Sequence, residues 1–494
     1  MFSDIQFLID KGDYQLAKDK LNLVLNKNHE PMISLEAEIY NLKILLCLDD
    51  FKSFETSYQR LIQYYTEHTS IFYFQIQNLN IEMLWRTNCL DKALDNALNL
   101  NIEPLVGVNI DFKTQYGYLL YNLSRITLYL GDIQKSQSYA TQSLEIRKTL
   151  PSKLDLSETL NVLGIIHGYN GESDKAIEFY KQSLSLKRAI GNKRLEAYSL
   201  NNIGENYRLM GDIEKALSYY NQCYEIGLEL NDLEAIRFGL IGKGSSYTSI
   251  GEYDTALQLY EECFSLFSDS LAPFHKIEFS FVILRLKLLM KKDYSEELKL
   301  INEIHDQFND NTIKFFSKMT KAFLLKESPR IKTRLMAQDI FEEILDDDIV
   351  NMEYTILAMQ SLVELYLIEL QISDNTSLLE NINGLIHDML ELANEQHFYP
   401  LMIKSIILQS RIAFLNNNID NCLQILQEAY LIVEQNKLDK FYPLIDYEKE
   451  FITEQLSKWK YLAESDASMY QKIQESHLLS YLQDIAKLDV DHRN

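Results

Sequence analysis

The feature that most constrains the fold of this chain is a forty-residue period. The glycines Gly131, Gly171, Gly211 and Gly251 follow one another at intervals of forty residues. The stretches around them align as YLGDIQKSQSYATQSL, YNGESDKAIEFYKQSL, LMGDIEKALSYYNQCY and SIGEYDTALQLYEECF. Such a period is typical of repeated helix hairpins, because one hairpin cannot bury its own apolar face whereas stacked neighbours can.

Each repeat also places small and large residues at fixed distances from its glycine. Small residues lie seven positions before it and five positions after it: Ser124, Gly164, Gly204 and Gly244, then Ser136, Ala176, Ala216 and Ala256. The ninth residue after it is Ala140, Tyr180, Tyr220 or Tyr260. Two antiparallel helices approach closely only where side chains are small, and glycine can end a helix in a left-handed conformation. The pattern therefore predicts a tight helix hairpin around each glycine.

This arrangement of small, Gly, Ala and Tyr positions resembles the tetratricopeptide repeat. The forty-residue spacing and the phrases TLNVLG (159–164) and LNNIG (200–204) are similar to the long-helix repeats of kinesin light chains and Pins-type polarity scaffolds. The resemblance is strong over four repeats, roughly 118–267. It implies an all-α fold, a right-handed α-solenoid of stacked antiparallel hairpins.

Weaker copies of the pattern extend to both ends of the chain, and we expect eleven or twelve hairpins in all. The turn and small-residue positions there are Gly12 with Ala17, Asn88 with Ala93, and Glu297, Ala337 and Cys422. Glu297 departs from the pattern and puts close packing in doubt there. We divide the chain into degenerate hairpins at 1–110, a core of four well-formed repeats at 111–267, and degenerate hairpins with a capping helix at 268–494. The segment 268–273 is a hinge or a tight turn, since Pro273 can restart a helix.

Composition supports a helical chain and argues against binding to phosphate groups. Gly (16) and Pro (7) are scarce among 494 residues, and the formal net charge is −24. Such a chain is repelled by nucleic acid and by anionic membranes, and we expect neither as a partner. We expect no membrane span, because even the apolar stretch 279–290 contains Arg285 and Lys287. Residues 351–400 carry eight acids and no Lys or Arg, which serves solubility or forms a docking face for a basic partner.

The five cysteines point to a reducing compartment. They form no Cys-x-x-Cys pair, and Cys223 and Cys263 occupy equivalent repeat positions, as small core residues would. The amino-terminal stretch MFSDIQFLIDKGD carries acids where a signal peptide needs basic residues. We therefore expect a cytoplasmic protein.

The sequence carries no motif that predicts catalysis, a cofactor or a metal. IGKGSSY (241–247) has the wrong order for a phosphate-binding loop and lies within a predicted helix. None of the nine histidines shows metal-ligand spacing, and His167 takes a packing position that Tyr207 and Tyr247 fill in later repeats. Asp346, Asp347 and Asp348 lack the rest of a calcium loop. We predict that the chain is not an enzyme.

The resemblance implies that the first helix of each hairpin lines a concave groove. Carried over to this sequence, the groove residues are Tyr118, Tyr121, Asn122, Arg125, Asn161, Tyr198, Asn201, Asn202, Glu205, Arg208, Phe238 and Ser245. Tyr118, Tyr198 and Phe238 share one repeat position and form either an aromatic rail for a ligand or packing between helices. The asparagines can pair with a peptide backbone. Arg125 and Arg208 either anchor a ligand carboxylate or pair with neighbouring acids.

The sequence leaves two functional hypotheses open. The preferred one is a non-enzymatic scaffold that binds an extended or helical segment of a partner protein in the groove. The alternative is a sensor, in which a ligand or peptide alters the repeat array and so regulates a separate effector protein.

Overall fold

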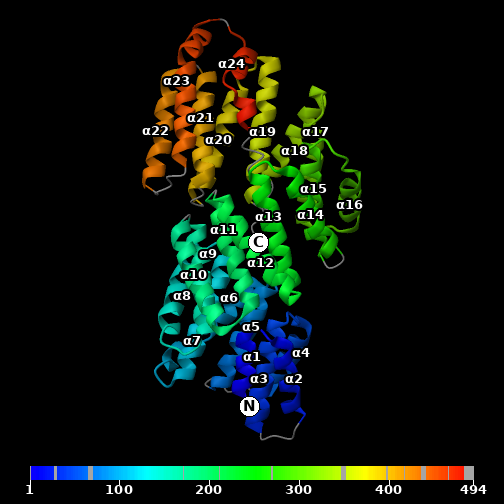
Figure 1. The fold of residues 1–494 in the computed structure, drawn as a ribbon, viewed down its shortest axis with the longest axis vertical. Helices are drawn as coiled ribbons and strands as arrows, with labels where there is room; N and C mark the ends of the chain where they lie inside the picture. The colour runs from blue at the N-terminus through cyan, green and yellow to red at the C-terminus, as the bar shows by residue number, and fades with distance from the viewer. Residues whose placement is uncertain are drawn as a thin grey trace. The chain divides into compact units, whose positions relative to one another are not determined.

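A computed structural model describes residues 2–26, 31–64, 70–170, 172–210, 212–268, 271–346, 352–395, 399–416, 418–435, 441–465 and 467–482. Within these ranges the chain forms α-helices, one short 3-10 helix and no strand (Figure 1). The predicted all-α fold is confirmed. Twelve consecutive pairs of helices form the stacked hairpins of an α-solenoid.

The chain divides into two compact units, and the division passes through two helices. Unit 1 consists of residues 1–210 and 218–238, and unit 2 of residues 211–217 and 239–494. The division therefore falls inside the predicted core at 111–267 rather than at its ends. It crosses α12 (Ile213–Leu230) and α13 (Leu233–Ser249).

Eleven α-helices and one short 3-10 helix lie wholly within the described part of unit 1. They are α1 (Phe2–Lys11), α2 (Tyr14–Leu25), α3 (Pro31–Cys47), α4 (Phe51–Tyr64), α5 (Ile71–Arg86), α6 (Leu90–Asn99), η1 (Glu103–Leu105), α7 (Ile110–Tyr129), α8 (Ile133–Arg147), α9 (Lys153–Tyr169), α10 (Ser173–Ile190) and α11 (Lys193–Leu209).

Unit 2 continues the same alternation of paired helices. They are α14 (Tyr253–Phe267), α15 (Pro273–Leu289), α16 (Ser295–Gln307), α17 (Asn311–Lys326), α18 (Ile331–Asp346), α19 (Met352–Ser373), α20 (Leu378–Glu395), α21 (Tyr399–Leu415), α22 (Ile419–Gln435), α23 (Tyr442–Glu464) and α24 (Met469–Glu475).

The turns form where the sequence predicted them. Gly131 and Gly251 have φ angles of +81° and +79°, and Gly12 and Asn88 also have positive φ. This left-handed conformation ends a helix without strain at glycine, and asparagine tolerates it. The other two periodic glycines, at 171 and 211, lie outside the described residues.

The small positions allow close contact between the two helices of a hairpin. A Cβ added at Gly164 would lie 2.6 Å from the Tyr180 ring, and one at Gly244 would lie 3.0 Å from the Tyr260 ring. The later small positions Ala176 and Ala256 are fully buried. Small and large residues thus interlock across these two hairpins, as the spacing predicted.

One departure from the pattern has a clear structural explanation, and one expected helix start is confirmed. Glu297, in a small-residue position, forms an ion pair with Lys287 at 2.7 Å, so a polar contact replaces the close helix contact there. Pro273 begins α15, in the first-turn position that its missing N–H favours.

The structure also shows where several residues discussed in the sequence analysis lie. IGKGSSY lies within α13, in line with its interpretation as part of a helix. His167 is buried, stacks on Phe179 and contacts Glu172 through Nδ1. Cys223 and Cys263 are fully buried.

Helix α19 is the part of the described structure to compare with the expectation that the chain has no membrane span. Within the described residues, 354–373 form one helix long and apolar enough to span a bilayer, and most of it is buried inside the protein. A core helix has the same length and composition. Two acids of the 351–400 segment also turn inward from this helix, since Glu364 pairs with Lys326 and Glu369 accepts a hydrogen bond from Gln338.

Candidate ligand-binding cavity

A cavity of about 1100 Å³ lies within unit 1. Most of its lining comes from α1, α3, α5, α7, α9 and α11, which are the first helices of successive hairpins. This is the wall that the sequence predicted to be concave. The lining is rich in charged and aromatic side chains, in contrast to the apolar seams between helices.

The amino-terminal helix closes this wall on itself. Asn192, in the turn between α10 and α11, donates a hydrogen bond from Nδ2 to the carbonyl of Asp10 at 2.9 Å. Asn192 is fully buried, and a Cβ added at Gly12 would lie 3.0 Å from its Oδ1. We call this the closing contact. It joins segments 182 residues apart and holds α1, which contributes Gln6, Ile9 and Asp10 to the cavity lining.

The closing contact can be broken selectively with Asn192→Asp. Asn192 Oδ1 accepts from the Leu195 N–H and caps α11, and an aspartate keeps this role while losing the donor to Asp10. Loss of a buried hydrogen bond costs about 1–3 kcal/mol. We expect amide hydrogen exchange in α1 to accelerate roughly tenfold or more, with the first turn of α11 unchanged. Unchanged exchange in α1 would show that the contact does not hold this helix.

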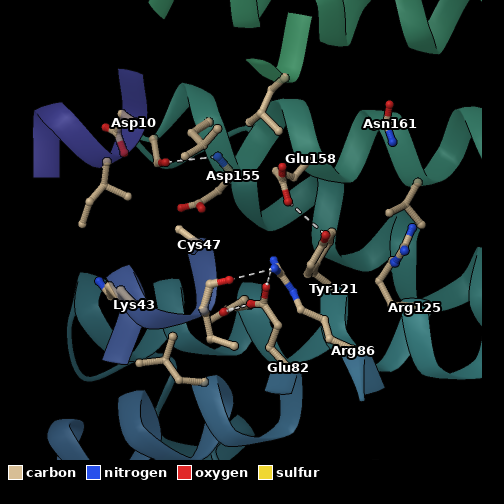
Figure 2. Close-up of a pocket in the computed structure, with 18 of the residues that line it drawn as sticks. Asp10, Lys43, Cys47, Glu82, Arg86, Tyr121, Arg125, Asp155, Glu158 and Asn161 are labelled. Carbon is tan, nitrogen blue, oxygen red and sulfur yellow. Dashed lines mark hydrogen bonds and ion pairs between the residues drawn. The ribbon is translucent and has the colours of Figure 1, made fainter. Parts of the chain in front are cut away.

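One side of the cavity is formed by an arginine between two aromatic rings. The Arg125 guanidinium lies 4.9 Å from the Trp85 ring centre and 5.1 Å from that of Tyr129, and donates to the Tyr129 hydroxyl at 2.8 Å. Its Nε is buried without a hydrogen-bond acceptor. Among the described residues Arg125 has no ion-pair partner. Figure 2 shows Asn161 on the same side.

Asn161 belongs to a short chain of amides on the wall. Its Oδ1 accepts from Asn202 Nδ2 at 3.2 Å, and the carbonyl of Asn202 accepts from Asn206. The NH₂ group of Asn161 has no acceptor in the described part of the chain. It therefore presents two donors at the cavity surface.

The middle of the cavity is a satisfied polar network. Glu82 binds Arg86 and the Tyr118 hydroxyl, and Arg86 also reaches Asp49 at 3.5 Å. Burial, followed by the nearby Glu82 charge, raises the pKa of Tyr118 well above its usual value. The hydroxyl thus stays protonated and donates to the carboxylate.

On the side of the cavity away from Arg125, α1 places the carboxylate of Asp10 close to the repeats. Figure 2 shows Asp10 and Lys43 far from Arg125, with Asp155 beside them. Burial, and to a lesser extent the charge of Asp155, raises the pKa of Asp10. Gln6 Nε2 donates to Asp10 at 2.6 Å. This side is built by residues that no local sequence pattern connects.

Five of the predicted groove residues line the cavity. They are Tyr118, Tyr121, Arg125, Asn161 and Tyr198. The Tyr121 hydroxyl donates to Glu158 at 3.0 Å and that of Tyr198 to Glu234 at 2.9 Å. The aromatic positions therefore serve both packing and the cavity surface, and Phe238 packs edge-on against Tyr198.

Asn122 and Ser245 lie elsewhere than expected. Asn122 is fully buried between α5 and α7, where it accepts from Trp85 Nε1 at 3.1 Å and donates to the Asn78 carbonyl. Ser245 is buried within its hairpin against the Tyr260 hydroxyl at 2.9 Å. Both satisfy helix-to-helix contacts, so the structure places them in the packing rather than on the groove.

The remaining predicted residues lie outside the cavity lining. Arg208 is buried and pairs with Glu205 at 2.6 Å, and Tyr220 donates to Glu205 at 2.8 Å. Arg208 was expected either to anchor a ligand carboxylate or to pair with a neighbouring acid. In the structure it pairs with the neighbouring acid Glu205. Asn201 and Asn202 are half-buried, and Asn202 reaches the cavity lining through its hydrogen bond to Asn161.

Sequence reasoning missed two buried cations, Arg147 and Lys187, which both line the cavity. They lie forty residues apart, at one repeat position near the end of the second helix. The period that identified the small positions would have identified this pair as well. Within the described residues, no group of His, Cys, Asp and Glu has the geometry to hold a metal.

Comparison with known proteins identifies the repeat. The sequence profile of the tetratricopeptide repeat matches residues 115–189 and 155–229. Residues 115–229 therefore consist of tetratricopeptide repeats (TPRs). The matched segment contains most of α7 and all of α8 to α11, which supply much of the cavity wall. No curated protein has significant sequence similarity to the chain.

Several solved structures of low sequence identity are similar to this chain. They include the apo form of the quorum sensor NprR from B. thuringiensis (13% identity, 75% of this chain and 98% of the other covered, TM-score 0.49). A Rap protein complexed with competence and sporulation factor has 13% identity, coverage of 70% and 97%, and a TM-score of 0.48. Nearly identical TPR-like repeats of a putative kinesin light chain from Podosopora anserina have 17% identity, coverage of 39% and 96%, and a TM-score of 0.33.

Proposed function

We propose that unit 1 is a non-enzymatic receptor for a peptide end, either a short free peptide or the terminal tail of a partner protein. TPR arrays are protein-interaction folds, and the inner wall of this one encloses the cavity. The observation that carries the proposal is the closing contact between Asp10 and Asn192. Because α1 lies across the wall, an end of a chain enters the cavity more readily than an uninterrupted helix of a partner.

The polar groups of the cavity favour a carboxyl terminus at Arg125. Its buried Nε lacks an acceptor, and the rings of Trp85 and Tyr129 hold the guanidinium in place. The NH₂ group of Asn161 lies on the same side. A carboxylate is the group that a guanidinium and an amide donor bind best together. Tyr121 and Tyr198 supply apolar surface with hydroxyls already engaged.

The proposal is tested with two pools of short random-sequence peptides, one with free carboxyl termini and one with carboxyl-terminal amides. The wild-type chain should retain the free pool at least about tenfold better, since a charge-assisted hydrogen bond contributes about 1.5–3 kcal/mol. Arg125→Ala should abolish this preference. Arg60→Ala is the matched control, because Arg60 pairs with Glu38 outside the cavity lining. Retention of neither pool by the wild type would overturn the proposal.

The second candidate function is that of a sensor. It is favoured because α1 both lines the cavity and takes part in the closing contact. This helix lines the cavity through Gln6, Ile9 and Asp10 and is also held by the closing contact. A ligand touching α1 would alter the stability of that contact and so signal to a separate effector. A scaffold without signalling would show the same hydrogen exchange in α1 with and without bound peptide.

Two further expectations stay as proposals. A basic partner would bind the exposed acids of α20, which are Glu380, Asp388 and Glu391. We place the protein in the cytoplasm, where its five free thiols would remain reduced.

A further inference from the structure

The TPR wall contains a repeated buried cation. Arg147 is 3% exposed and donates to Thr159 Oγ1 at 2.9 Å, while Lys187 is 2% exposed and donates to Ser199 Oγ at 2.9 Å. Both the cations and their hydroxyl partners are forty residues apart. The third repeat has Gly227 and Gly239 at these positions, so the motif occurs in two of the repeats that line the cavity.

Neither cation has an ion pair within the described part of the chain. Arg147 completes its contacts with the Asp155 carbonyl at 2.7 Å and the Tyr121 ring at 4.7 Å. Lys187 has only its bond to Ser199, and burial lowers its pKa to about 8. A buried ammonium without an anion is unfavourable, whereas helix packing alone would be served better by an apolar side chain.

The nearby acids form no hydrogen bond or ion pair with these cations within the described residues. Glu158 favours the charged form of Lys187 through space, but its carboxylate accepts a hydrogen bond from Tyr121 instead. Asp155 contributes its carbonyl, not its carboxylate, to Arg147. Lys43 adds a further cation to the lining and rests over the Tyr40 ring at 4.9 Å. Arg194 is already paired with Asp232 at 2.7 Å. Arg147 and Lys187 thus form hydrogen bonds only to neutral oxygen atoms of the described residues.

We infer that Lys187, supported by Arg147, forms a subsite for the carboxylate of an aspartate or glutamate side chain of the bound peptide. This inference rests on the proposed function and specifies its ligand as an acidic peptide. The subsite is separate from Arg125, which takes the carboxyl terminus. The flexible, compact ammonium of Lys187 makes the direct contact, and the Arg147 guanidinium, fixed by two hydrogen bonds, supplies a second positive charge.

The test compares two pools of short random peptides with free termini. One pool contains Asp and Glu at the randomised positions, and the other has Asn and Gln in their place. We expect the wild-type chain to retain the acidic pool about tenfold or more over the amide pool. Lys187→Met should make the retention of the two pools equal while keeping the preference for free over amidated carboxyl termini. Lys181→Met on the same helix is the control, because Lys181 is exposed outside the cavity lining.

The outcomes separate this inference from the function on which it rests. Lys187→Met is expected to fold at least as well as the wild type, since it removes a buried unpaired charge, and its melting temperature checks this. Retention of peptides without acidic enrichment would overturn the subsite and leave the receptor function standing. Persistence of the acidic preference in Lys187→Met would overturn it too. Retention of nothing would overturn both. Inorganic phosphate is the second probe, and tight phosphate binding that Lys187→Met abolishes would overturn the assignment to a peptide carboxylate.

Discussion

Replacing Glu448 by alanine is expected to destabilise the carboxyl-terminal hairpins of unit 2 by about 3–5 kcal/mol. Glu448 and Arg411 are 1% and 5% exposed, and Arg411 Nε donates to Glu448 Oε1 at 2.8 Å. Arg411 also donates to the carbonyls of Ser476 and His477, which ties α21 to the end of the chain. Without Glu448 the positive charge of the Arg411 guanidinium would stay buried without a counter-charge. The expected loss of stability is a large fraction of the free energy of unfolding of an ordinary protein domain.

Hydrogen exchange in peptides from 399–482, measured at increasing urea concentration, reports the unfolding of these hairpins in the wild type and the variant. The double variant Arg411→Met with Glu448→Leu is the control, because a buried ion pair can often be replaced by apolar residues at little cost. It should recover much of the lost stability. If Glu448→Ala unfolded at the same urea concentration as the wild type, the pair would contribute nothing to this part of the fold.

The second prediction exchanges the small and large residues of one TPR hairpin. Gly164→Ser should destabilise α9 and α10 by about 1–3 kcal/mol, because the new Cβ would meet the buried Tyr180 ring at 2.6 Å. Tyr180→Ala alone should cost about 3–5 kcal/mol by leaving a cavity. The preceding repeat already carries the pair Ser124 and Ala140 at these two positions.

The double variant Gly164→Ser with Tyr180→Ala reproduces that natural pair. It should lose clearly less stability than the sum of the single changes, and thermal unfolding of the three variants measures this coupling. Gly384→Ala is the control for glycine replacement itself. A Cβ there has no neighbour within 4 Å, so this change should stabilise α20 by about 0.5–1 kcal/mol. Strict additivity of the Gly164 and Tyr180 changes would contradict the interlocking of the two positions.

The hairpin positions were predictable because they depend on contacts close in sequence. The ring of Tyr180 lies against Gly164 of the same hairpin, and Gly131 and Gly251 adopt the left-handed turn conformation within it. Even the degenerate turn at Asn88 was found in this way. Such contacts repeat with the period, so an alignment of the repeats is sufficient to locate them.

The cavity residues were only partly predictable. Arg125, Asn161 and Tyr198 line the cavity, whereas Asn122 lies in the seam between α5 and α7 although it shares a repeat position with Asn202. Groove and seam are neighbouring faces of one helix, so spacing alone does not separate them. Trp85 of the preceding, degenerate hairpin decides the place of Asn122, because its indole N–H needs a buried acceptor.

The sequence by itself determined the α-solenoid, its period, the interlocking small and large positions, and the helices that face inward. All of these follow from side-chain volume and backbone conformation within a hairpin. Only the tertiary structure decided that α1 closes the wall through Asn192 and that Lys187 is buried without an anion. The closing contact joins residues 182 positions apart, and the environment of a charge depends on every segment packed around it. No local spacing carries that information.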